Sequence, residues 1–153
     1  MRNGLTVIIP KGAAAELDRL VHLREILLED KKRAYNQLES AIVPIFPEFL
    51  HIFKDLQIKT VEHLLKYYPL PESIIKLGLE DLIKLLHTVS RGRFGRKKAE
   101  IFYEAALSSA GIKEGIEGTL LMIKSLYDKI SLLDRQLSQV EESIGTKLSE
   151  VSY

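Results

Sequence analysis

One stretch of this sequence has residue types and spacing suited to a chemical task, the binding of phosphate groups. In SRGRFGRKKAE, residues 90–100, two glycines interrupt a run of cations and a helical pattern follows directly. A helix start presents free backbone N–H groups and a partial positive charge, which attract anions. Cationic side chains around such a start neutralise nucleic-acid phosphates. The candidate nucleic-acid-binding residues are Arg91, Arg93, Arg96, Lys97 and Lys98.

Residues 90–98 of this stretch are called the basic turn below. They also fit a solvated turn between two helices. Gly92 and Gly95 supply the backbone freedom that a tight turn needs. The turn loosely resembles a helix-hairpin-helix, in which a Gly–hydrophobic–Gly turn is followed three residues later by a small residue. Here the glycines are three positions apart instead of two. Phosphate binding and a plain solvated turn therefore both remain open.

The other polar residues form no catalytic or metal-binding pattern. The histidines lie in different segments, and no two of them are four positions apart on one helix, as a zinc site would require. Neighbouring carboxylates lie on exposed helix faces, where solvated charge is the usual case. We therefore predict no catalytic residue, no metal site and no cofactor in this chain. The residues considered are His22, His51, His63, His87, Glu29–Asp30 and Glu141–Glu142.

Composition restricts the class of protein. The chain has 153 residues, with 22 Lys and Arg against 21 Asp and Glu, so its net charge is only +1. Nucleic-acid binding would therefore have to come from a local patch. Cysteine is absent, which fits a reducing compartment. The longest apolar run, Val7–Ile9, is too short to span a bilayer. We expect a soluble cytoplasmic protein without membrane contact.

Two long helices are predicted, at 13–42 and 116–150. In both, apolar residues recur at spacings of three and four. The second pattern persists for about five heptads, which is typical of a coiled-coil seam. Arg24 and Lys31 lie close to the seam of the first helix, as snorkelling or partner-pairing residues. The residues of the predicted oligomerisation seam are Leu120, Ile123, Leu126, Ile130, Leu133, Leu137 and Val140.

Shorter amphipathic helices lie between the long ones. Pro44 and Pro47 are predicted to end the first long helix, and Thr60 is predicted to cap a helix that Pro69 stops. The short helices are expected at 47–53, 60–68, 71–77, 79–89 and 94–110. Four parts result: an extended tail (1–11), a first long helix (12–43), a compact helical subdomain with the basic turn (44–112) and a second long coiled-coil helix (113–153).

The predicted fold class is all-α, with two long arms and a compact bundle inserted between them. The arms form either an antiparallel hairpin within one chain or a coiled coil with a second chain. A heptad seam does not identify its partner, so the hairpin and the dimer remain alternatives.

A series of short motifs follows one another along the chain. They are Leu23-Arg24, Leu27-Leu28, Asn36-Gln37-Leu38, Phe46-Pro47-Glu48, Leu64-Leu65, Tyr68-Pro69-Leu70-Pro71, Ser90-Arg91-Gly92-Arg93-Phe94-Gly95 with Lys98-Ala99, and Ala106 with Ser109 and Gly111. In this order and spacing the chain resembles the central helical region of DEDD-type insertion-sequence transposases. The resemblance covers roughly residues 12–145.

The resemblance implies a parent enzyme that moves a DNA element. Such enzymes have a RuvC-like first domain with four metal-binding acidic residues, which use a divalent metal such as Mg²⁺. A later domain supplies a serine nucleophile beside an Ile-Pro-Gly-Ile-Gly type motif. Neither part matches residues of this chain, so no catalytic residue is carried over. The implied partners are DNA and, in some members, a structured RNA.

The leading hypothesis is a transposase fragment that serves in homo-oligomerisation, as a dimer, and in nucleic-acid positioning. The alternative is a structural coiled-coil protein-interaction module without nucleic-acid binding. Enzymatic activity of this chain alone ranks third, because its acidic residues and histidines do not converge.

Overall fold

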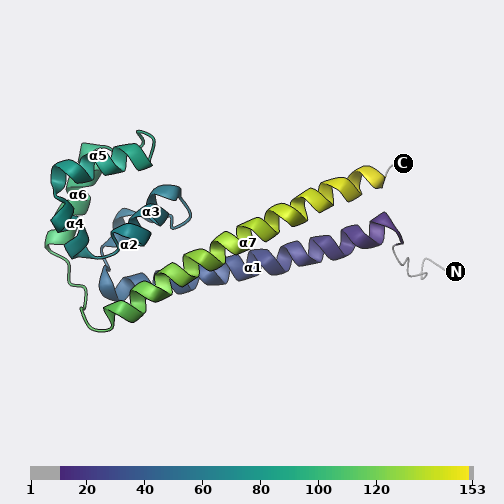
Figure 1. The fold of residues 1–153 in the computed structure, drawn as a ribbon, viewed down its shortest axis with the longest axis horizontal. Helices are drawn as coiled ribbons and strands as arrows, with labels where there is room; N and C mark the ends of the chain where they lie inside the picture. The colour runs from purple at the N-terminus through teal and green to yellow at the C-terminus, as the bar shows by residue number, and fades with distance from the viewer. Residues whose placement is uncertain (1–10, 152–153) are drawn as a thin grey trace. The chain divides into compact units, whose positions relative to one another are not determined.

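The computed structural model describes residues 11–151, and all regular structure in that range is α-helical (Figure 1). The all-α prediction is confirmed. The helices are α1 (Ala13–Ile45), α2 (Phe49–Ile52), α3 (Lys59–Tyr67), α4 (Pro71–Leu77), α5 (Leu79–Val89), α6 (Arg96–Leu107) and α7 (Ile116–Glu150). The predicted tail at 1–11 lies almost wholly outside the described residues.

The chain divides into two compact units, in both of which α1 and α7 take part. Unit 1 comprises residues 1–33 and 130–153, of which 11–33 and 130–151 are described, and unit 2 comprises residues 34–129. Unit 2 extends beyond the predicted subdomain at 44–112, because it includes the end of α1 and the beginning of α7.

In unit 1 the two long helices pair as an antiparallel hairpin. Leu27 of α1 is buried together with Leu133 and Val140 of α7. Arg24 forms an ion pair with Glu141, and the Lys31 Nζ lies 2.7 Å from the Asp134 Oδ1. The later residue of α1 thus pairs with the earlier residue of α7, which establishes the antiparallel direction. The prediction that Arg24 and Lys31 lie beside the seam is confirmed, and they pair within the chain.

Unit 2 has an aromatic core. The Phe102 ring of α6 stacks on that of Phe46 at 5.5 Å between centroids, and meets the rings of Phe49 and Phe53 edge to face at 5.5 and 5.0 Å. All four rings are almost completely buried. Edge-to-face and offset rings at these distances are stabilised beyond their buried area. The core therefore fastens α2 and the end of α1 to α6.

Some predicted helix ends differ from the structure. α1 continues through Pro44 to Ile45, because a proline in the last turn removes only one hydrogen bond of the helix. Thr60 is not the N-cap of α3, since the helix begins at Lys59 after Ile58. The buried Thr60 hydroxyl instead donates to the Val89 carbonyl, with 3.5 Å between the oxygens. Tertiary packing thus overrides the local capping preference of this threonine.

A polar clamp joins the segment after α1 to the segment after α6. The Glu48 carboxylate accepts hydrogen bonds from the Ser109 hydroxyl at 2.6 Å and from the Ala110 N–H at 3.1 Å. The Ile112 N–H donates to the Pro44 carbonyl at 2.8 Å. The segment that follows α1 is therefore hydrogen-bonded, within unit 2, to the segment between α6 and α7.

Gly111 allows the closest backbone approach in this clamp. A Cβ atom at this position would lie 2.1 Å from the Ile45 carbonyl oxygen and 2.7 Å from its carbonyl carbon. Both are backbone atoms, which cannot move aside as a flexible side chain can. Only glycine fits here without displacing the end of α1.

Gly111→Ala is expected to lower the free energy of unfolding by at least about 2 kcal/mol, because the new methyl group overlaps the backbone of Ile45. Urea unfolding followed by circular dichroism measures the change. Gly118→Ala is the control, since a Cβ there meets nothing within 4 Å in α7 and should stabilise by up to about 1 kcal/mol. Equal stability of the Gly111→Ala variant and the wild type would contradict this account.

The clamp also predicts a pH dependence. Partial burial of Glu48 opposes ionisation, but the hydrogen bonds from Ser109 and Ala110 outweigh it and hold the pKa of this carboxyl below its ordinary value of 4.5. A lowered pKa gives stabilisation that is present above pH 4.5 and is lost as the pH falls through the folded-state pKa.

Glu48→Gln should therefore destabilise the chain at pH 7 by about 1 kcal/mol, because a neutral amide accepts weaker hydrogen bonds than a carboxylate. The difference from wild type should shrink as the pH is lowered to 3. Urea unfolding at pH 7, 5 and 3 tests this, with Glu39→Gln on the exposed face of α1 as the matched control. A difference that stays constant with pH would refute the role assigned to Glu48.

Candidate nucleic-acid interface

The basic turn begins where α5 ends, in a Schellman motif. The Arg91 N–H donates to the Thr88 carbonyl at 3.2 Å, and the Gly92 N–H donates to the His87 carbonyl at 2.8 Å. This pair of bonds is the pattern that closes a helix when the residue after the C-cap is left-handed. The last carbonyls of α5 are therefore satisfied within the turn.

Arg91 occupies the position of this motif that glycine normally takes. Its φ is +53°, and it is the only non-glycine residue with a positive φ in the described part of the chain. A left-handed conformation costs an L-residue with a Cβ roughly 1–2 kcal/mol. Strained backbone of this kind often lies at functional sites. Neither periodicity nor composition indicates this strain.

The turn ends where α6 begins, and the charges at this helix start are unfavourable. Gly95 is the N-cap and provides no side-chain hydrogen bond, and no acidic residue lies in the first turn. That turn instead contains Arg96, Lys97 and Lys98. By contrast, α1, α3, α4, α5 and α7 each have a carboxylate in the first turn. Cations at a helix N-terminus oppose the helix dipole.

Three of the five predicted cations have partners within unit 2. The Arg96 guanidinium pairs with both carboxylate oxygens of Glu80, at 3.3 and 3.2 Å. The Lys98 ammonium lies 5.2 Å from the ring centroid of Phe53 and 5.4 Å from that of Phe94. The Arg93 guanidinium lies 4.9 Å from the centroid of Phe94. Arg93 and Lys98 are thus held against the Phe94 ring, and Arg96 is held by Glu80.

The other two cations are exposed. Within residues 11–151, neither Arg91 nor Lys97 has an ion pair or a ring contact. Their charges are therefore available to a ligand. The structure thus places all five predicted residues in or beside one turn. Arg93, Arg96 and Lys98 have partners there, and Arg91 and Lys97 have no ion pair or ring contact within residues 11–151.

His87 also lies at this turn. A Cβ added to Gly92 would lie 3.6 Å from its Nε2, so the imidazole is next to the turn. Sequence reasoning treated this residue as one of several scattered surface histidines. The only indication in the sequence is its position, four residues before Arg91 and five before Gly92, the two residues of this turn with a positive φ.

The predicted oligomerisation seam lies mostly inside the chain. Ile123 and Leu126 are buried in unit 2, and Ile130, Leu133 and Val140 are buried in unit 1. Leu120 and Leu137 are partly buried. The heptad pattern of α7 is therefore filled by other parts of the same chain, as the hairpin alternative requires.

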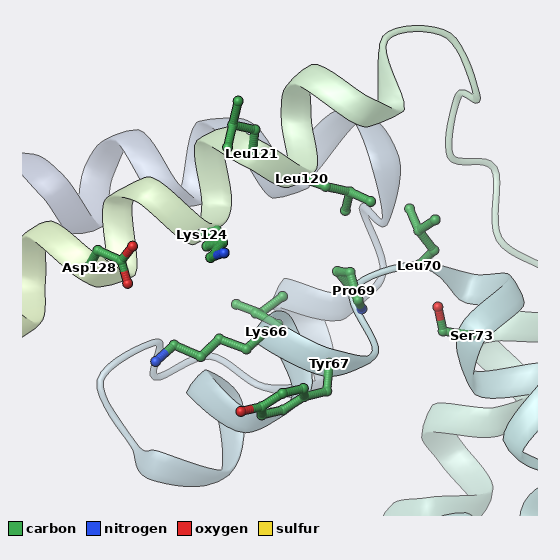
Figure 2. A pocket seen from close by; sticks show the side chains of 10 residues that line it. Lys66, Tyr67, Pro69, Leu70, Ser73, Leu120, Leu121, Lys124 and Asp128 are labelled. Atoms are coloured by element: carbon green, nitrogen blue, oxygen red, sulfur yellow. The ribbon is translucent and has the colours of Figure 1, made fainter.

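A cleft of about 820 Å³ lies in unit 2 between α7 and the end of α3 (Figure 2). Figure 2 shows Leu120, Leu121, Lys124 and Asp128 along the α7 side of this cleft. The opposite wall comes from α3, α4 and the segment that joins them. The residues of that wall are Leu65, Lys66, Tyr67, Pro69, Leu70 and Ser73.

The cleft contains large apolar side chains that are open to solvent. Tyr67 and Leu121 are each 65% exposed. Lys66 is held by Glu62 at 2.9 Å, and this hydrogen bond raises the pKa of its ammonium. Sequence reasoning missed this cleft, because its two walls are far apart in the chain.

No group of three or more His, Asp or Glu residues that could hold a metal ion occurs in the described range. Among the helices described, none is both long and apolar enough to cross a membrane. Comparison with known proteins adds no relative, because no protein-family model, no curated protein and no solved structure matches this chain.

Arg91→Gly is expected to raise the free energy of unfolding by about 1 kcal/mol, because glycine adopts a left-handed φ without steric cost. Arg91→Ala is the matched control, since alanine also removes the charge but keeps the Cβ. The difference between the two variants in urea unfolding isolates the backbone strain. Equal stability of both variants would show that Arg91 is not strained.

Proposed function

We propose that this chain is a helical module that binds the phosphate backbone of nucleic acid through the basic turn and associates with a second copy of itself. The observation that carries the proposal is the first turn of α6, which has three cations and no carboxylate. A bound phosphate would compensate both the helix dipole and the clustered charge. The strained Arg91 supports the same proposal, because glycine would be more stable at its position.

The arrangement favours contacts to phosphates over contacts to bases. Phe53 is buried, and the half-buried Phe94 has Arg93 and Lys98 over its ring. Single-strand binding proteins normally offer exposed aromatic rings on which bases stack. At the basic turn the rings are instead covered by cations, and phosphate contacts carry no direct sequence information.

The transposase assignment rests on the sequence resemblance. Two of the matching motifs, Phe46-Pro47-Glu48 and Ser109 with Gly111, meet in the clamp of unit 2. The matching residues thus include a set with a common structural role. In the proposed context, DNA and structured RNA are the partners, and any divalent metal such as Mg²⁺ would act in other parts of the parent enzyme.

A structural protein-interaction module without nucleic-acid binding is the second candidate. The open cleft with Tyr67 and Leu121 favours it, since exposed apolar patches often mark protein contacts. The two candidates differ in whether the basic turn binds phosphate.

Binding should be measured by fluorescence anisotropy with a 20-base-pair DNA duplex and with a structured RNA of similar length, over a series of salt concentrations. Four to five neutralised phosphates predict a log–log slope near about −4 on duplex DNA. Changing Arg91, Arg93, Arg96 and Lys97 to Ala should abolish most of that slope. Glu80→Gln should strengthen binding, because it releases Arg96 from its ion pair.

The matched control is Lys32→Ala with Lys129→Ala, which removes exposed cations of α1 and α7 that form no ion pair in the described structure. Its salt slope should stay close to that of the wild type. Absence of binding at low salt, or an unchanged slope in the quadruple variant, would rule out the basic turn as the binding site.

A further inference from the structure

His87 is an ionisable side chain beside the basic turn that is not one of the five cations of the proposed phosphate site. It lies in the last turn of α5, and its backbone carbonyl accepts the Gly92 N–H at 2.8 Å. Its Nε2 lies 3.6 Å from the place that a Cβ of Gly92 would take, so the imidazole is next to the turn backbone between Arg91 and Arg93. The side chain is exposed. A ligand on this side of the turn therefore meets the imidazole ring.

The imidazole has no anionic partner in the protein. Within residues 11–151 it forms no ion pair and no ring contact. Its charged neighbours along the chain are cations: Lys84 one turn earlier on α5, and Arg91 and Arg93 on either side of Gly92. None of the carboxylates on α5 or on the helices that contact it pairs with this ring. These are Glu62 of α3, Glu72 of α4, Glu80 and Asp81 of α5, and Glu100 and Glu104 of α6.

Three of these carboxylates are already held by other cations. Glu62 pairs with Lys66 at 2.9 Å, and Glu72 pairs with Lys113 at 2.9 Å. Glu80 pairs with Arg96. A positive charge on His87 is therefore left to be neutralised by a ligand.

We propose that His87 is a further phosphate-binding residue of the basic turn, which acts in its protonated form and makes nucleic-acid binding strengthen as the pH falls. The proposal rests on the proposed function and adds a proton-dependent sixth charge to its five cations. An imidazolium donates a hydrogen bond from each ring nitrogen, and such charged donors bind phosphate oxygens strongly. Imidazole is the side chain that ordinarily changes its charge between about pH 5 and 8, whereas lysine and arginine keep theirs.

The arrangement couples the proton to the phosphate. While the turn has no ligand, the cations beside Gly92 repel a proton on the imidazole. A bound phosphate offsets that repulsion, so the proton and the phosphate favour each other's binding, and this coupling is reciprocal. Because the protonated form makes the additional contact, affinity is higher on the acidic side of the imidazole titration and lower on the basic side.

Fluorescence anisotropy of the complete chain with a 20-base-pair DNA duplex, at pH 5.5 and pH 8 over a series of salt concentrations, tests this coupling. One additional neutralised phosphate should make the log–log salt slope steeper by about 0.9 at pH 5.5, and should tighten binding roughly threefold to tenfold at low salt. His87→Gln should bind at both pH values as the wild type does at pH 8. His87→Lys has a permanent charge, so it should keep the steeper slope at both.

His22→Gln and His51→Gln are the matched controls, because both histidines are exposed and neither is in the basic turn. Each should retain the pH dependence of the wild type, which separates a contact at the turn from the general gain of positive charge in acid. Circular dichroism should be the same for all variants, since the replaced side chains are exposed.

A wild-type affinity and slope that do not change with pH would overturn the proposal and leave phosphate binding by the five cations in place. A pH dependence that persists in His87→Gln would also overturn it, by assigning the titration to another group such as Glu80, whose protonation would release Arg96. Absence of binding at both pH values would instead refute the proposed function, and this proposal with it.

Discussion

The clamp between Glu48 and the segment Ser109–Gly111 is the constraint on which the arrangement of unit 2 depends. It holds the start of the inserted helices against their end, with Gly111 directly against the carbonyl of Ile45. Because the clamp joins the segment before α2 to the segment after α6, the helices between them pack together around the stacked rings of Phe46 and Phe102. Within the same unit α5 and α6 contact each other, and the basic turn joins them.

Two features of the basic turn are each unfavourable in free energy. Arg91 has a backbone conformation that favours glycine. The first turn of α6 has cations, whereas the first turns of α1, α3, α4, α5 and α7 each have a carboxylate. Each cost is small against the total stability of a domain, but both occur within a few residues. In the proposed function a bound anion would offset the clustered cations of α6, whereas the left-handed Arg91 also serves the Schellman motif that closes α5. Conflicts between local preference and fold are expected mainly at functional sites.

In unit 1, α1 and α7 are held together by apolar contacts and ion pairs along their length. Among the described residues of unit 1, those that are buried are Leu27, Ile130, Leu133 and Val140. Ion pairs of Arg24 and Lys31 flank the cluster of Leu27, Leu133 and Val140. Exposed ion pairs contribute little, so the few apolar contacts provide most of the stabilisation there. The narrow seam leaves the outer faces of both helices free.

Sequence alone determined the all-α class, both long helices and the helices at 71–77 and 79–89, because helical periodicity and proline or glycine stops are local properties. It also identified the five cations of the basic turn. It did not predict the start of α3, since the Thr60 hydroxyl bonds to Val89 instead of capping the helix. Nor did it show that the seam of α7 is filled within the chain, that Arg96 is paired with Glu80, or that Lys124 and Asp128 face a cleft. Those facts depend on which distant residues meet, and only the tertiary structure decides that.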